Sequence, residues 1–67
     1  MTKIFSAREL CIECEREIKQ RLRVYNRLIE QKKMKRDDAD RQIAMMQQIR
    51  DRYDNEATAE ETRSRLL

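Results

Sequence analysis

Glycine, proline, histidine and tryptophan are all absent from this chain of 67 residues. Without glycine, the usual loop that cradles a phosphate cannot form. Without histidine, the commonest general base and metal ligand is missing. No apolar run approaches the ~18 residues that a membrane-spanning helix needs. From these absences we expect no enzymatic activity, no bound cofactor and no contact with a membrane.

Charged residues make up 43% of the sequence, and the net charge is +3. The lack of helix breakers and the many Glu, Lys, Arg, Gln and Leu residues favour helix almost everywhere. A first helix is predicted over residues 6–31, because apolar residues recur every three or four positions on one face. This first stripe consists of Ile4, Ala7, Cys11, Cys14, Ile18, Leu22, Tyr25 and Ile29, flanked by Leu10 and Leu28.

A second helix is predicted over residues 38–55, and its apolar face is Ala39, Ile43, Met46, Ile49, Tyr53 and Ala57. Asp37 is a suitable N-cap for it, which places a turn at residues 33–36. The predicted fold is therefore all-α: residues 1–57 form an antiparallel hairpin of two long helices. One uninterrupted helix is the alternative, because no residue in the turn strictly breaks a helix. Residues 58–67 are predicted to form a short helix capped by Thr58 or a frayed tail.

A single hairpin of this size buries little apolar surface. We therefore expect two or more hairpins to assemble as a helical bundle or coiled coil, with a homodimer favoured. The residues predicted to form the core and the oligomer contacts are Leu10, Cys11, Cys14, Ile18, Leu22, Tyr25, Leu28, Ile29, Ala39, Ile43, Met46, Ile49 and Tyr53.

Cys11 and Cys14 lie in the middle of the first stripe, where a free cysteine packs as a small apolar side chain. Two thiolates are also half of a tetrahedral zinc site, so two chains together could bind zinc between subunits. A thioredoxin-like redox role needs an exposed thiol of low pKa in a βαβ context, which the pattern does not indicate. Core packing is the preferred interpretation, with no metal bound.

Basic residues concentrate in residues 16–36, where nine Lys and Arg face two Glu. Such a cluster could bind the phosphate backbone of a nucleic acid. It could instead be a solvated face that meets the acidic second helix of a neighbouring chain, because no aromatic residue is placed for base stacking. The candidate binding surface comprises Arg16, Lys19, Arg23, Arg27, Lys33, Lys35 and Arg36.

Two resemblances bear on origin. Arg21-Leu22-Arg23-Val24-Tyr25, Leu28-Ile29 and Ala39-Asp40-Arg41, followed by Ile43, Met46, Ile49 and Tyr53, resemble a family of short phage- and prophage-encoded proteins of unassigned function. That family usually carries Pro at the position of Asn26 and Gly at that of Lys32, and this chain has neither. The resemblance implies that the protein is of viral or prophage origin and acts in the host cytoplasm.

Leu10-Cys11-Ile12-Glu13-Cys14-Glu15 is similar to the second zinc knuckle of the DksA/TraR-type proteins, which act on RNA polymerase. Those proteins need a second Cys pair upstream, and none of the ten residues before Cys11 is Cys or His. That zinc site cannot be completed within this chain.

The expected function is therefore that of a small helical interaction protein, which contacts a host or phage protein. A nucleic-acid-binding accessory factor in phage DNA metabolism or gene regulation is the alternative. No export signal is recognisable at the N-terminus and the cysteine pair is expected to be reduced, so we expect a cytoplasmic location.

Overall fold

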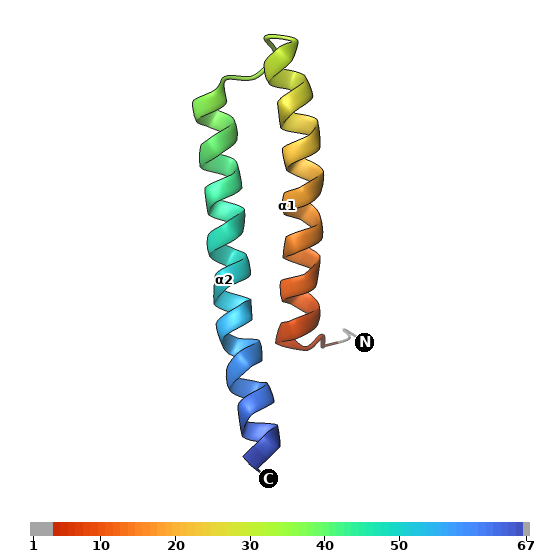
Figure 1. The fold of residues 1–67 in the computed structure, drawn as a ribbon, viewed down its shortest axis with the longest axis vertical. Helices are drawn as coiled ribbons and strands as arrows, with labels where there is room; N and C mark the ends of the chain where they lie inside the picture. The colour runs from red at the N-terminus through yellow and green to blue at the C-terminus, as the bar shows by residue number, and fades with distance from the viewer. Residues whose placement is uncertain (1–3, 67) are drawn as a thin grey trace.

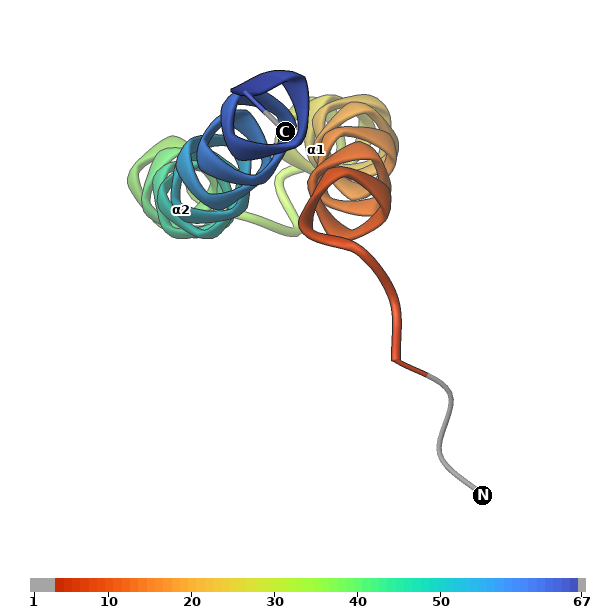
Figure 2. The same ribbon diagram turned by 90° about the horizontal axis from the view of Figure 1, so that it is seen from below.

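The computed structural model describes residues 4–66, which form two long antiparallel helices (Figure 1). Helix α1 spans Ala7–Glu30 and helix α2 spans Arg36–Leu66. Figure 2, which looks along the hairpin from its open end, shows the two helices next to each other and the C-terminal end of α2 leaning across toward α1. The predicted all-α hairpin is confirmed, and the alternative of one uninterrupted helix is wrong. Residues 1–3 of the predicted domain 1–57, and Leu67 of the predicted tail 58–67, lie outside the described residues.

A capping box starts α1. The Ser6 hydroxyl accepts a hydrogen bond from the Glu9 backbone N–H at 3.1 Å, and the Ser6 backbone N–H donates to Glu9 Oε1 at 3.3 Å. These two bonds satisfy donors that the first turn of a helix leaves without a partner. The Ser-x-x-Glu spacing alone marks this start, close to the predicted residue 6.

The end of α1 is a Schellman motif. The Lys33 N–H donates to the Leu28 carbonyl at 2.8 Å, and the Lys32 N–H donates to the Ile29 carbonyl at 3.0 Å. This pairing needs a left-handed residue one position after the C-cap. Lys32 occupies that position with a φ of 58°, although glycine is the residue that adopts it without a steric penalty. The chain therefore turns at residues 31–35 and pays for the turn with local backbone strain.

We expect Lys32→Gly to stabilise the hairpin by about 1 kcal/mol, because the left-handed conformation costs a side chain about 1–2 kcal/mol and glycine little. Urea unfolding followed by circular dichroism measures the change. Lys33→Gly is the matched control, and it should leave stability unchanged or lower, since Lys33 has no positive φ. Equal effects of the two substitutions would contradict strain at Lys32.

Helix α2 begins two residues earlier than the predicted residue 38. The Lys35 carbonyl accepts the first bond, from the Ala39 N–H at 3.1 Å. The prediction of Asp37 as N-cap is therefore wrong. Asp37 and Asp38 lie inside the first turn, where their carboxylates favour the positive end of the helix dipole.

Helix α2 also runs on to Leu66, so the predicted end at residue 55 and the separate tail or short helix at 58–67 are wrong. No glycine or proline interrupts the chain there, and Thr58 caps nothing because it lies within the helix. Ala57 is completely buried, and Glu61 forms an ion pair with Arg8 near the start of α1. These two contacts hold the second half of α2 against α1.

The core is thin. Its buried side chains are mostly small. Among the described residues, none larger than Cys11 is fully buried. The buried set is Ala7, Cys11, Cys14, Ile18, Ala39, Ile43 and Ala57. Of the other predicted core residues, Leu10, Tyr25, Leu28, Ile29, Met46 and Tyr53 are half-buried, whereas Leu22 and Ile49 are exposed. Over residues 4–66, neither helix is long and apolar enough to cross a bilayer.

Candidate interaction surfaces

One flank of the hairpin is closed by ion pairs. The Arg8 guanidinium donates to Asp54 Oδ1 at 2.9 Å and to the two carboxylate oxygens of Glu61 at 2.9 and 3.3 Å. These hydrogen bonds raise the pKa of Arg8 and lower the pKa of Glu61 below its ordinary 4.5. The fork of Arg8 thus joins the start of α1 to two turns of α2. We call this side the ionic flank.

Acid should weaken the ionic flank. The folded-state pKa of Glu61 is lowered by Arg8, so the pair stabilises the hairpin above the unfolded-state pKa of 4.5 and this contribution is lost as the pH falls below it. We expect Glu61→Gln to lower the melting temperature by a few degrees at pH 7 and by less at pH 3. Thermal unfolding between pH 3 and 7 measures this difference.

Glu60→Gln is the control for that experiment, because Glu60 is exposed and forms no ion pair within residues 4–66. It should change the melting temperature little at any pH. A Glu61→Gln variant that lost the same number of degrees at pH 3 as at pH 7 would argue against a charge-based clamp.

The opposite flank is apolar. Tyr25 Oη donates to Gln42 Oε1 at 2.8 Å on this side. Successive residues of a helix point about 100° apart. By this spacing, some apolar residues of α1 lie on the side away from Arg8, and some apolar residues of α2 lie on the side of Gln42, away from Glu61. These two sets lie on the same side of the hairpin. We call this surface the apolar flank; its apolar residues are Leu10, Val24, Leu28, Met46, Ile49 and Tyr53, and the Glu17–Arg21 ion pair lies among them on α1.

The apolar flank is only partly covered by the chain itself. Five of its six residues are half-buried, and Ile49 is 44% exposed. Two hollows open at its margins. One of about 400 Å³ lies beside Met45 and Ile49, and one of about 330 Å³ lies beside Leu10 and Phe5. This flank is therefore a surface into which further apolar side chains could pack.

The predicted binding residues are all on the outside. Arg16, Lys19, Arg23 and Arg27 are exposed along the side of α1 that faces away from α2. Arg16 pairs with Glu13 at 3.4 Å, whereas the structure shows no ion pair for the other three within residues 4–66. The four charges form one basic row along the outer face of α1.

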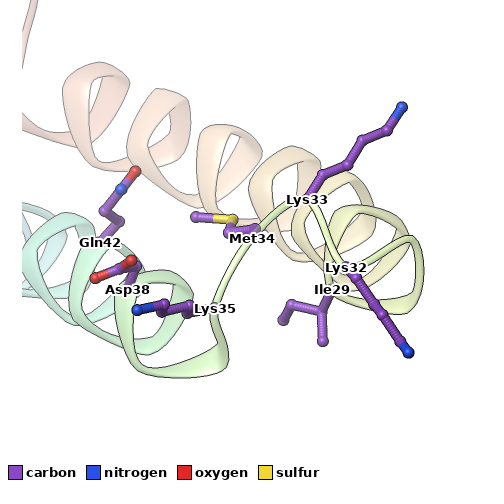
Figure 3. A pocket seen from close by; sticks show the side chains of 7 residues that line it. All are labelled: Ile29, Lys32, Lys33, Met34, Lys35, Asp38 and Gln42. Atoms are coloured by element: carbon purple, nitrogen blue, oxygen red, sulfur yellow. The ribbon is translucent and has the colours of Figure 1, made fainter.

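The remaining predicted binding residues, Lys33, Lys35 and Arg36, are exposed at the tip of the hairpin. A hollow of about 660 Å³ lies there, lined by Lys33 and Lys35 together with Ile29, Lys32, Met34, Asp38 and Gln42. In Figure 3, Lys32 and Lys33 extend away from the ribbon in different directions. The lysines raise the positive potential of the tip, but those two do not converge on one point.

The cysteines are packed inside the hairpin. Cys11 is fully buried, and its Sγ donates to Glu15 Oε1 at 3.5 Å and accepts from Arg8 Nη1 at 3.8 Å. Burial raises the pKa of the Cys11 thiol, and the nearby Glu15 carboxylate raises it further. Cys14 is also a buried free thiol. Zinc binds thiolates, so this environment disfavours the intersubunit zinc site and supports a packing role.

Removing either thiol should therefore weaken the packing of the hairpin and should not remove a bound metal. We expect Cys11→Ala and Cys14→Ala each to destabilise the hairpin by about 1 kcal/mol, measured by urea unfolding. Metal analysis of the purified protein should find no stoichiometric zinc. One zinc per two chains, with unfolding on chelation, would contradict this.

Two carboxylates of α1 form ion pairs within the same helix. Glu17 Oε1 accepts from Arg21 Nε at 2.9 Å, and Glu13 pairs with Arg16. Within residues 4–66, no three His, Cys, Asp or Glu side chains are grouped to hold a metal ion. Ile12 is 51% exposed and lies on the outer face of α1.

Sequence reasoning omitted Arg8 and Val24. Arg8 carries no local signal, because both its partners are more than 45 residues away and meet it only through the antiparallel arrangement. Val24 lies outside the narrow stripe used to predict the core. It lies about 120° from the centre of that stripe, so only a face widened beyond Leu10 and Leu28 on that side would have included it.

No family model, curated protein or solved structure matches this chain. The resemblances to the phage-encoded family and to the DksA/TraR-type zinc knuckle therefore stay predictions.

Proposed function

We propose that this protein is a small helical interaction protein that acts through protein–protein contacts, first with a second copy of itself and then with a host or phage protein. The observation that supports it is the apolar flank, which one hairpin leaves partly open. Buried apolar surface contributes about 25 cal/mol per Å², so covering this flank favours association.

The shape of the single chain supports the same proposal. The hairpin measures 53 × 26 × 14 Å, and its radius of gyration is 15.6 Å, whereas a compact domain of this length has about 11 Å. Its accessible surface is 5975 Å², against about 4,500 Å² for a typical monomer of this mass. A second hairpin would cover part of this excess and give a four-helix arrangement.

Sedimentation equilibrium between about 1 and 200 µM tests self-association directly. We expect a dimer at tens of micromolar, with circular dichroism showing that helix content and dimer fraction fall together on dilution. A folded, fully helical monomer at 100 µM would overturn the proposal.

Nucleic-acid binding is the second candidate, and the exposed basic row of α1 favours it. If four to six phosphates are neutralised, binding to duplex DNA should weaken by roughly 200- to 2000-fold for a tenfold rise in salt. Fluorescence anisotropy with labelled duplex and single strands measures this. Submicromolar binding at 150 mM salt that is lost in a correctly folded Arg23→Glu variant would make nucleic-acid binding the better account. We expect only the weaker affinity that any basic protein has for DNA.

We further propose a phage or prophage origin and a place in the host cytoplasm. The resemblance of residues 16–53 to the phage-encoded family supports the origin, and the buried, unpaired cysteines agree with a reducing compartment. Capture of partners from host lysate on the immobilised protein, identified by mass spectrometry, would name the partner.

A further inference from the structure

Charge is divided along the long axis of the hairpin. The tip half, residues 16–50, carries eleven basic and five acidic side chains, a net of +6. The base half, residues 4–15 and 51–66, carries four basic and eight acidic side chains, a net of −4. The fold creates this division, because it brings the acidic start of α1 beside the acidic second half of α2, at the end of the molecule opposite the turn (Figure 1).

We propose that the second copy packs antiparallel on the apolar flank, with the tip half of each hairpin beside the base half of the other. This inference rests on the self-association proposed above. Helices that pack together lie about 8–10 Å apart, which is close to the Debye length of about 8 Å at physiological salt. Neighbouring charges therefore interact: an antiparallel pair places +6 beside −4 twice, whereas a parallel pair places +6 beside +6.

The helix dipoles do not decide this orientation. Each hairpin contains two antiparallel helices, so its backbone dipoles largely cancel. The side-chain charges carry the preference.

The apolar flank also suits this arrangement. Its residues run from Leu10 and Tyr53 near the base to Val24 and Leu28 toward the tip. A two-fold axis across the middle of the flank makes the surface self-complementary, because the base end of one flank then covers the tip end of the other. Ile49 lies near that middle, so the two copies of Ile49 come close to the axis.

A distance between two tips tests the orientation. Lys33→Cys places a thiol at the exposed tip, and a nitroxide label attached under native conditions reports the distance between the two copies by pulsed electron paramagnetic resonance. Residue 33 lies about 15 residues from the centre of the flank, so the antiparallel dimer predicts about 45 Å between tips at 1.5 Å per residue. A parallel dimer predicts about 10–20 Å.

Two controls accompany the label. Wild-type protein treated identically shows that the buried Cys11 and Cys14 take up no label. Gln48→Cys, exposed on the outer side of α2 level with the middle of the flank, should give much the same distance in either orientation. Sedimentation of the labelled samples separates the outcomes: a dimer at about 45 Å supports the inference, a dimer at short distance overturns the orientation alone, and a monomer overturns the self-association itself.

Salt gives an independent measurement on the unmodified chain. Raising sodium chloride from about 50 to 500 mM screens charge interactions, so the antiparallel dimer should dissociate several-fold more readily. A parallel dimer, held together against like charges, should tighten instead. An affinity that rises with salt would overturn the inference.

Discussion

Ile49→Glu should leave the protein monomeric at concentrations where the wild type is dimeric, with the dissociation constant raised at least about 100-fold. The substitution removes an apolar side chain from the centre of the apolar flank and puts a carboxylate in its place. A two-fold dimer contains the change twice. Two carboxylates would then approach each other with little water around them, which is costly without a cation nearby. Sedimentation equilibrium measures the change.

Ile12→Glu is the matched control for this variant. Ile12 and Ile49 are the same residue type, with 51% and 44% exposure, but Ile12 lies on the outer face of α1. It should dimerise like the wild type. Equal weakening by the two substitutions would show that added negative charge, rather than the apolar flank, changes the association. If the Ile49→Glu protein still dimerised, the dimer contact would have to lie on another face of the hairpin.

Ile18→Ala should have the second large effect, a loss of about 2–4 kcal/mol in the free energy of unfolding. Ile18 and Ile43 are the two branched residues of a core otherwise built from Ala and Cys, so its neighbours have few atoms with which to fill a cavity. A core this small seldom supplies more than about 3–5 kcal/mol. The variant should therefore be largely unfolded at 37 °C. Thermal unfolding of both proteins at one fixed concentration measures this.

Ile12→Ala controls for the loss of side-chain volume without loss of the core. It should change stability by no more than about 0.5 kcal/mol, as an exposed substitution usually does. An Ile18→Ala variant as stable as Ile12→Ala would mean that the packing of α1 on α2 contributes little, and that oligomer contacts carry the stability.

The periodic pattern of apolar residues was sufficient to predict the buried face of each helix. Ile18 and Ile43 both lie on their predicted stripes and are both buried, because a period of 3.6 residues puts such positions on one side whatever the neighbour is. The same pattern could not predict the end of α2. The apolar residues thin out after Tyr53, yet the helix continues to Leu66, because Ala57 and Glu61 find partners on α1.

The turn shows a similar division. Asp37 as a predicted N-cap placed the turn at residues 33–36, close to the observed 31–35, although Asp37 itself lies inside the first turn of α2. The conformation of the turn depends on backbone geometry. Lys32 takes up a left-handed φ of 58° that its residue type does not favour. The paired hydrogen bonds to the Leu28 and Ile29 carbonyls stabilise this conformation.

The sequence by itself thus determined an all-α chain, a reversal near residue 33 and the two faces that meet. Local propensity, periodicity and the absence of glycine and proline act within a few residues, and they can be read without knowing the fold. Only the tertiary structure decided that Arg8 would join Asp54 and Glu61, that the apolar flank would lie opposite this ionic flank, and that the charges would divide between tip and base. Each of these features joins residues far apart in the chain, and the antiparallel packing of α1 on α2 is what sets their register.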